Sequence, residues 1–247
     1  MKALVTGASS GIGREISFRL MELGYDLIVV SRNQKTLDKI YKDCKRSVTT
    51  IGLDLGELDN CYQLYEQVKE EKVDILVNNA GFGDCGNFSE TSLDKELEMI
   101  DLNIRAYHVL MKLFLQDFVK RDYGRILNVA SMAGFMPGPY MATYYATKAY
   151  IVNLTLAVYE ELKRDHSQVK ISVFCPGPVK TNFSKRARVH FRVGSLTAKG
   201  ASEKALAGMF QNQLAIIPGN MKMNYVLIKL FPIKMVLSVN SLIQKRS

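Results

Sequence analysis

The sequence contains few of the residues that build metal sites and disulfide frameworks. Its 247 residues include four cysteines and three histidines, and no two cysteines form a CxxC pair. The cysteines, Cys44, Cys61, Cys85 and Cys175, stand far apart, which argues against a zinc site and suits a reducing compartment. We therefore expect no metal and a cytoplasmic location.

Long apolar runs are also missing. Charged residues or Pro232 interrupt the longest apolar stretches, so no segment predicts a membrane-spanning helix. The first residues, MKALVTG, enter a strand-like run at once, and we expect no secretory signal peptide. Because linkers, low-complexity tracts and internal repeats are absent too, a single domain over residues 1–247 is the simplest interpretation.

Acidic residues are nearly absent from the last quarter of the chain. Residues 182–247 contain eleven Lys and Arg residues and one acid, Glu203, whereas residues 1–181 carry a net charge of −1. The net charge of +9 therefore originates in this quarter. The sequence has no base-reading motif, zinc finger or aromatic–basic interleaving, so we expect no nucleic-acid partner.

The sequence does contain a regular alternation of strand-like and helix-like segments. Short apolar runs predict strands, and apolar residues at helical spacing follow the first of them until Gly24. Strands separated by helices indicate an α/β fold with a doubly wound parallel sheet. The expected strands are residues 3–5, 27–30, 48–51, 73–77, 125–129, 170–174 and 214–217.

A glycine-rich stretch, TGASSGIG, follows the first expected strand. Gly7, Gly11 and Gly13 would allow a tight turn, a close approach of the backbone to a pyrophosphate, and helix amides directed at that anion. The same letters contain GASSG, which fits the GxSxG nucleophile turn of hydrolases. That alternative needs a late histidine paired with an acid, and His166 and His190 stand in no recognisable site.

Seven motifs in order along residues 3–181 resemble the short-chain dehydrogenase/reductase family. They are TGASSGIG, LDL at 53–55, NNAG at 78–81, Asn103 in DLN, Ser131, YYATK at 144–148 and PGPVKT at 176–181. The resemblance implies one Rossmann-like catalytic domain that binds a nicotinamide dinucleotide. It also implies hydride transfer between a ketone and a secondary alcohol. The last quarter of the chain resembles the family only weakly.

The YxxxK pattern of the family is satisfied by Tyr144 and Lys148. Four residues apart on a helix, the two side chains share one face, whereas Tyr145 points about 100° away. The resemblance makes Tyr144 the proton donor and acceptor and gives Lys148 the nicotinamide ribose. It places the Ser131 hydroxyl on the substrate oxygen, and it makes Asn103 the holder of a water that links Lys148 to solvent.

The acid–base role requires a tyrosine with an unusual pKa. A pKa near ~10 is too high for a base at neutral pH. A neighbouring ammonium stabilises the phenolate and lowers that pKa. A shift of ~3 units corresponds to about 4 kcal/mol, which we expect from Lys148 together with the positive charge of the oxidised nicotinamide.

The second expected strand ends in IVVSRN, which indicates NADP as the cofactor. Family members that prefer NAD usually have an acid where this chain has Ser31, and the Arg32 guanidinium suits a 2′-phosphate. Many NADP-preferring members also have a basic residue where Ser10 stands. By resemblance, the other cofactor contacts are Gly7, Ser9, Ser10, Gly11, Ile12, Gly13, Asp54, Leu55, Asn79, Ala80, Gly81, Tyr144, Lys148, Pro176, Gly177, Val179 and Thr181.

The loop at 131–141, SMAGFMPGPYM, is expected to form an apolar, adaptable wall of the substrate site. Residues 182–212 follow where the family has a substrate lid. The basic residues of that lid could meet an anionic substrate tail, a carrier protein or lipid head groups; they are Lys185, Arg186, Arg188 and Arg192. The candidate substrate residues are Met132, Phe135, Met136, Tyr140, Met141 and Phe183.

The C-terminal extension, residues 218–247, is apolar with scattered lysines. It has three open roles: a cover over the pocket, a contact between subunits, or a peripheral contact with a membrane surface. Pro232 argues against one long helix there.

Two substrate classes fit these features. A hydroxysteroid or another lipophilic carbonyl suits the Met-rich wall, and a 3-oxoacyl thioester on a carrier protein suits the basic lid. A non-catalytic dinucleotide-binding regulator is the alternative from another class, but it would need a damaged set of catalytic residues, and all four are present.

We also expect a homodimer or homotetramer. The helices expected within 93–118 and after Lys148 hold apolar residues beyond the face needed to cover a sheet, and in the family these helices pair between subunits. The surplus residues are Tyr107, Phe114, Leu156 and Tyr159. A monomer whose C-terminal segment covers this surface is the alternative.

Overall fold

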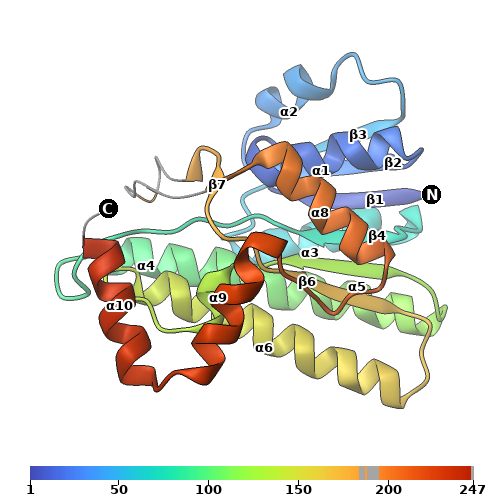
Figure 1. Ribbon diagram of the computed structural model, residues 1–247. Coiled ribbons are helices and arrows are strands. Elements are labelled where there is room, and N and C mark those ends of the chain that lie inside the picture. The colour runs from blue at the N-terminus through green and yellow to red at the C-terminus, as the bar shows by residue number, and fades with distance from the viewer. Residues whose placement is uncertain (184–186, 188–194, 246–247) are drawn as a thin grey trace.

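The computed structural model describes residues 1–183, 187 and 195–245, in which strands and helices alternate (Figure 1). The strands are β1 (Lys2–Thr6), β2 (Asp26–Ser31), β3 (Val48–Gly52), β4 (Ile75–Asn78), β5 (Arg125–Val129), β6 (Lys170–Phe174), β7 (Val179–Lys180), β8 (Leu196–Thr197) and β9 (Ala215–Ile216). The helices are α1 (Gly11–Glu22), α2 (Gln34–Tyr41), α3 (Leu58–Val68), α4 (Leu93–Ile100), α5 (Tyr107–Lys120), α6 (Ala142–Arg164), α8 (Ala198–Phe210), α9 (Gly219–Leu230) and α10 (Ile233–Lys245). Short helical segments are η1 (Lys69–Glu71), η2 (Asp101–Ala106) and η3 (Met132–Phe135).

Seven of the described strands form one parallel sheet in the order β3-β2-β1-β4-β5-β6-β9. The strand order reverses direction between β1 and β4. In such sheets ligands bind beside that switch point, at the carboxyl ends of the strands. The predicted Rossmann-like, doubly wound sheet is confirmed, although β4 begins at Ile75 rather than at residue 73. β7 and β8 pair separately.

Helices cover both faces of the sheet because successive strand residues point to opposite sides. Leu27 and Val29 of β2 pack under α1, α2 and α8, whereas Ile28 and Val30 pack under α3, α5 and α6. The second core contains Phe114 and other side chains of α5 and α6. A nearly continuous apolar strand such as DLIVVS is therefore buried on both sides.

A buried chain of polar groups fixes α6 to the middle of the sheet. The Asn78 amide on β4 donates to Asn128 Oδ1 on β5 at 3.1 Å, and the Asn128 amide donates to Thr155 Oγ1 on α6 at 3.0 Å. Because buried polar groups need partners, this chain specifies where α6 lies on the sheet. The first half of the same helix carries Tyr144 and Lys148.

The C-terminal extension forms a helical hairpin beside the body of the molecule (Figure 1). α9 ends at Leu230 and α10 begins at Ile233, so the predicted interruption at Pro232 is confirmed. Over the described residues, no helix combines the length and apolarity needed to cross a membrane.

Candidate active site

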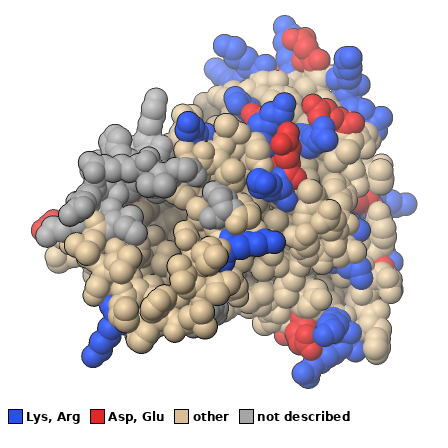
Figure 2. Space-filling model, in the orientation of Figure 1, with Lys and Arg blue, Asp and Glu red and all other residues tan. Residues whose placement is uncertain are grey.

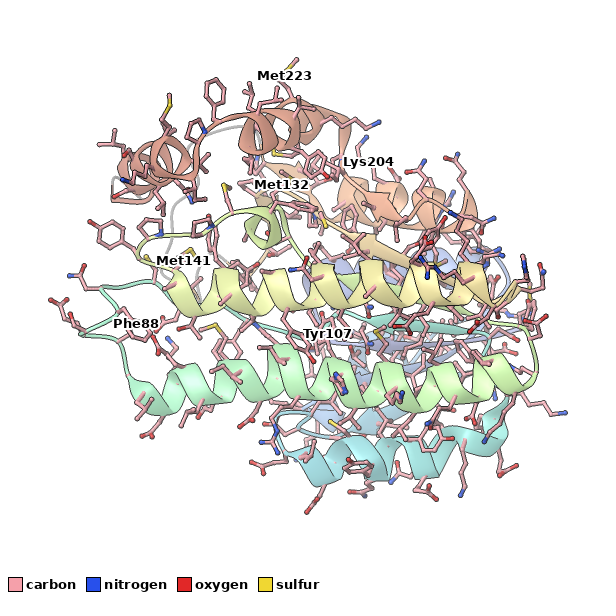
Figure 3. The ribbon with its side chains drawn as sticks, turned by 90° about the horizontal axis from the view of Figure 1, so that it is seen from below. Phe88, Tyr107, Met132, Met141, Lys204 and Met223 are labelled. Carbon is pink, nitrogen blue, oxygen red and sulfur yellow. The ribbon has the colours of Figure 1, made fainter. Side chains whose placement is uncertain are left out.

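The predicted catalytic residues come together at the carboxyl ends of β4, β5 and β6. Ser131 follows β5, Tyr144 and Lys148 lie on α6, and Asn103 lies on η2, which joins α4 to α5. Parallel strands end at the same edge of a sheet, so residues far apart in the sequence meet there. Figure 3 looks onto α5 and α6, with Tyr107 of α5 and Met141 at the start of α6 labelled.

Lys148 is the most constrained of these residues. Its ammonium donates to the backbone oxygen of Val129 at 3.1 Å and lies 5.3 Å from the ring centroid of Tyr107. Its exposed fraction is only 5%. Burial lowers the pKa of Lys148 to about 8, and the nearby Cys175 thiol partly opposes that shift.

Tyr144 is also buried, and its burial acts against the expected lowering of its pKa. Burial raises the pKa of Tyr144 above its usual value, and the hydrogen bond with the Ser131 side chain offsets only part of the rise. Lys148 Nζ lies 5.9 Å from the ring centroid of Tyr144 and donates to Val129 instead. In the protein without cofactor, loss of hydration outweighs the attraction of this distant ammonium, and the lowering expected from Lys148 together with the oxidised nicotinamide stays a prediction.

Asn103 connects the segment after β4 to α6 by side-chain hydrogen bonds. Its amide nitrogen donates to the Phe82 oxygen at 2.8 Å and to Thr147 Oγ1 at 3.1 Å, and its Oδ1 accepts from the Phe82 amide at 3.1 Å. These bonds hold the segment after β4 against α6, with Gly81 beside both Asn103 and Lys148. The water expected at Asn103 stays a prediction.

The glycine-rich loop has the shape expected of a pyrophosphate cradle. Gly7 and Gly11 have φ angles of 67° and 58°, in the left-handed region. Gly13 packs so closely on Asn79 and the Gly7 carbonyl that a side chain would have no room. α1 begins with no side-chain cap and no acid in its first turn, so its amides are available to an anion. These residues fit a dinucleotide.

The GASSG segment of the same loop lacks the geometry of a nucleophile elbow. That elbow holds its serine in a strained turn. Ser9 is not among the described residues that have positive φ, whereas Gly7 and Gly11 on either side are.

Alanine substitutions at two glycines distinguish the cost of a left-handed backbone from the cost of crowding a new side chain against its neighbours. Gly7→Ala is expected to weaken cofactor binding and to destabilise the fold by more than the ~1–2 kcal/mol typical of a left-handed non-glycine residue. A Cβ there would lie 2.8 Å from Asn79 Nδ2 and 2.9 Å from Ala80 Cα. Gly24→Ala is the matched control, since Gly24 has φ 90° with open space around it. Equal losses in urea unfolding for the two variants would contradict the crowding.

At the end of β2, Arg32 and Ser31 occupy the expected place for an adenosine ribose. Arg32 Nη1 lies 3.9 Å from Asp54 Oδ2, and both side chains are largely exposed, so the pair is loose. The Ser31 hydroxyl is buried and has no hydrogen-bond partner. Leu55, in contrast, turns its side chain into the core.

The other residues expected to contact the cofactor lie after β4, after β6 and at the turn into α1. Asn79 and Ala80 donate their backbone amides to Thr6 Oγ1, which fixes the turn after β4. Thr181 lies against Gly11, and Gly177 lies against Met221 of α9. The Pro176 oxygen accepts from the Ser131 hydroxyl at 3.4 Å. Val179 belongs to β7. Ser9, Ser10 and Ile12 lie at the turn into α1.

The candidate substrate residues divide into two groups. Met141 and Phe183 pack around Tyr144, and the Phe183 and Tyr144 ring centroids are 5.3 Å apart. Tyr140 lines a hollow next to Tyr144. Phe135 instead contacts Tyr225 of α9 edge to face, with ring centroids 4.7 Å apart. Met132, which is buried, and Met136, which is half-buried, belong to the same loop.

Part of the predicted lid cannot be placed at the site. Its basic residues, Lys185, Arg186, Arg188 and Arg192, lie outside the described residues. Within the described portion, Leu196–Phe210 forms β8 and α8, and α8 covers the face of the sheet that α1 also covers.

Several residues that shape the site belong to no motif singled out in the sequence. Tyr107 lies under the Lys148 ammonium and donates its hydroxyl to Val129 O at 3.0 Å, and burial raises its pKa. Cys175 is fully buried near Lys148, and burial raises the pKa of its thiol to about 12. Gly83 packs on Tyr144 and Phe183. Gly83 follows the NNAG motif and Cys175 directly precedes PGPVKT, and these positions were the available sequence signal for both residues.

Comparison with known proteins identifies the class. A family model described as short chain dehydrogenase matches residues 1–190. A 3-oxoacyl-[acyl-carrier-protein] reductase of Rickettsia bellii is 31% identical over 185 residues, which make up 74% of this chain and 75% of that protein. The fold and the match define a dinucleotide-binding oxidoreductase. The chain belongs to the short-chain dehydrogenase/reductase family, whose members bind a nicotinamide dinucleotide.

Solved structures agree with this assignment. A short-chain dehydrogenase from Sphingobium yanoikuyae in complex with NADPH aligns with a TM-score of 0.83 at 26% identity, covering 94% of this chain and 96% of that one. One from Burkholderia phymatum in complex with NAD aligns with a TM-score of 0.83 at 22% identity, covering 92% of each chain. Membership of this oxidoreductase family also removes the hydrolase alternative for GASSG.

Proposed function

We propose that the protein reduces the carbonyl of a lipophilic substrate, such as a hydroxysteroid ketone, to a secondary alcohol with NADPH, and catalyses the reverse reaction. The observation that carries the proposal is the cluster of Ser131 with the buried Tyr144 and Lys148 at the carboxyl ends of the central strands. Asn103 holds this cluster in place.

The mechanism follows from the protonation states of these residues. The nicotinamide, when bound, supplies the hydride. Tyr144 donates its phenolic proton to the carbonyl oxygen as negative charge develops there. Because burial raises the pKa of Tyr144, the phenol is neutral at neutral pH and ready to act as the acid in the reduction direction. The Ser131 hydroxyl donates to the same oxygen and orients it.

Lys148 contributes a charge and a hydrogen bond. With a pKa of about 8 it is largely protonated at neutral pH, and its ammonium is the cation of this buried site. We assign it the nicotinamide ribose and the stabilisation of the Tyr144 phenolate that remains after proton transfer. Val129 and Tyr107 hold its amine in the required place.

The surroundings of Tyr144 favour an apolar substrate. Phe82, Cys85, Met141 and Phe183 pack around the Tyr144 ring, and these side chains offer an adaptable apolar wall. Substrate binding at this wall would use burial of apolar surface, worth about 25 cal/mol per Å².

A 3-oxoacyl thioester is the second candidate substrate. The named relative from Rickettsia bellii acts on a carrier-protein thioester, and the predicted lid of this chain is basic. Turnover of steroid, aliphatic-ketone and 3-oxoacyl-thioester panels with NADPH separates the two candidates. A kcat/KM at least about tenfold higher for the thioesters would overturn the proposed substrate class.

Replacing Arg32 with Ala is expected to erode a preference for NADPH. A charge-assisted contact with the 2′-phosphate is worth about 1.5–3 kcal/mol, so the wild type should use NADPH at least ~10-fold more efficiently than NADH. Ser31→Asp should favour NADH, because its carboxylate would repel the phosphate and accept from a ribose hydroxyl.

Lys42→Ala is the control for the Arg32 variant. It removes an exposed positive charge from the far end of α2 and leaves the end of β2 unchanged. Steady-state kcat/KM with both cofactors is the measurement. Equal efficiency of the wild type with NADPH and NADH would defeat the cofactor assignment.

We propose a homodimer or homotetramer, although two of the apolar residues expected to form its interface are buried within the monomer. Tyr107 and Phe114 are not surplus surface residues, because each is 2% exposed within the monomer core. Exposed apolar side chains that remain on these helices are Leu93, Leu97, Val119 and Tyr150. Light scattering at micromolar concentration is expected to give a multiple of 27.8 kDa, and a monomer mass that persists on concentrating would contradict it.

A further inference from the structure

The outward side of the C-terminal hairpin carries a continuous apolar surface. The α9 members recur at intervals of three and four residues, and so do those of α10, which is the pattern of one helix face. All nine are between 42% and 73% exposed. This hairpin stripe consists of Met223, Val226, Leu227 and Leu230 on α9, Phe231 and Ile233 at the tip, and Met235, Val239 and Leu242 on α10.

The opposite side of the hairpin is already occupied. Tyr225 packs edge to face against Phe135. The Asn240 amide donates to the Pro137 oxygen at 3.0 Å, and only 6% of Asn240 is exposed. Met221 packs on Gly177. These contacts fix which side of each helix faces the body, so the hairpin stripe points away from it. Figure 3 shows Met223 on the outer side of α9, with Met132 on the inner side.

An amphipathic helix of a globular protein normally turns its apolar stripe toward the core. Here the two helices do the reverse, and the apolar residues gather on one exposed surface instead of being scattered. Contiguous exposed apolar surface of this kind marks a contact with another molecule or with a membrane.

The charge on the hairpin favours an anionic membrane over a second copy of the hairpin. Lys222 and Lys234 are exposed beside the stripe, and the sequence has no acid after Glu203. Figure 2 shows blue but no red atoms over the α9–α10 corner. A second copy of the hairpin would bring lysines together with no carboxylate to pair them, whereas anionic lipid head groups complement them.

The length of the helices decides how a membrane contact would be made. α9 has 12 residues and α10 has 13, so each extends about 20 Å at ~1.5 Å per residue. The hydrocarbon core is ~30 Å thick, and neither helix spans it. Short amphipathic helices with lysines at the edge of an apolar face lie in the plane of the interface.

We propose that the hairpin stripe docks on the surface of an anionic lipid membrane. Phe231 and Ile233 at the tip enter the boundary between head groups and acyl chains, and Lys222 and Lys234 meet the head groups. The hairpin rests on η3, directly after Ser131, so docking turns the substrate side of the molecule toward the lipid. Entry of a lipophilic substrate from the bilayer rests on the proposed function, whereas docking does not.

The chain contains no tryptophan, which permits a direct test on the full-length protein. Phe231→Trp places a single indole at the tip of the hairpin, and Tyr123→Trp places one at a comparably exposed residue next to β5. Tyr123 precedes the amino end of β5, at the edge of the sheet opposite the catalytic residues. The probe is a phosphatidylcholine vesicle in which about one quarter of the lipid is phosphatidylglycerol.

With these vesicles we expect the tryptophan emission of the Phe231→Trp protein to shift to the blue and to be quenched by brominated acyl chains. We expect neither effect for the Tyr123→Trp protein. Adding Lys222→Gln and Lys234→Gln to the reporter should weaken partitioning about fivefold for each lysine. Salt near 1 M, where the Debye length is ~3 Å, should weaken it as well.

A second pair of variants tests the apolar contribution by vesicle flotation. Leu230→Asp should abolish binding, whereas Leu93→Asp on α4, where the side chain is similarly exposed, should not. Circular dichroism and NADPH binding verify folding, and no step uses turnover, so the result is independent of the proposed reaction.

The proposal is overturned if the Phe231→Trp protein gives no blue shift with anionic vesicles, or if Leu93→Asp abolishes flotation as Leu230→Asp does. It is also overturned if the wild type ignores vesicles and light scattering shows an oligomer that Leu230→Asp converts to a monomer. That last result would identify a second copy of the chain as the occupant of the stripe.

Discussion

Tyr144→Phe is expected to lower turnover by about 10²–10⁴-fold, the usual contribution of a positioned general acid or base. The substitution removes a single oxygen from a side chain that is 8% exposed, so the packing of the ring on Phe183 persists. NADPH binding should change little, because the glycine loop and the start of α1 are untouched. Cofactor fluorescence titration and steady-state kinetics measure the two effects separately.

Tyr145→Phe provides the matched control. Tyr145 is the next residue on α6, its ring lies 6.1 Å from that of Tyr144, and it packs on Gly138. We expect its turnover to remain within about tenfold of the wild type. An inactive Tyr145→Phe enzyme, or an active Tyr144→Phe enzyme, would reverse the assignment of the two tyrosines.

Lys148→Met is expected to lose both turnover and cofactor affinity while gaining stability. The ammonium is buried, and its pKa is lowered from 10.5 to about 8, chiefly by burial. A shift of that size means that the folded protein disfavours the charged lysine by roughly 3 kcal/mol at neutral pH. A methionine of similar length removes this cost. It also removes the hydrogen bond to Val129, and that loss reduces the gain in stability by about 1 kcal/mol.

The pH dependence of stability gives an independent signature of Lys148. Below about pH 8 the lysine is protonated in both the folded and the unfolded states. Between about pH 8 and 10.5 the folded protein releases this proton while the unfolded chain keeps it. Because the unfolded state then binds more protons, this residue makes stability rise with pH across that window.

Urea unfolding near the two ends of this window, for the wild type and Lys148→Met, is the measurement. Other titrating groups contribute to both proteins, so the difference between them isolates Lys148. The wild type should gain up to about 3 kcal/mol relative to the variant as the pH rises. A difference that is constant across the window would mean that the buried lysine has an ordinary pKa.

Much of the fold could be predicted from local patterns. The apolar runs predicted all seven strands of the main sheet, because a strand covered on both faces must be apolar throughout. Pro232 predicted the interruption between α9 and α10, since proline removes a helix hydrogen bond. These expectations depend only on neighbours in the sequence, and the structure confirms them.

The errors came from side chains whose surroundings depend on the tertiary structure. Tyr107 and Phe114 lie outside a single apolar stripe on their helix, yet both are buried, because α5 is enclosed by the sheet, α3 and α6. The spacing of Tyr144 and Lys148 on one helix also did not reveal how strongly Tyr144 is buried, and this burial raises its pKa in the protein without cofactor. The catalytic and cofactor roles taken from the resemblance remain predictions.

The residues assigned to hydride transfer and the C-terminal hairpin occupy separate parts of the sequence. Every residue assigned to hydride transfer precedes residue 182, and β9 completes the sheet at Ile216. The hairpin that follows adds no described strand and meets the catalytic loop through a few contacts, chiefly Tyr225 on Phe135 and Asn240 on Pro137. Exchange of the segment after residue 217, with those contacts kept, would therefore give the molecule a different outer surface while leaving the residues assigned to hydride transfer in place.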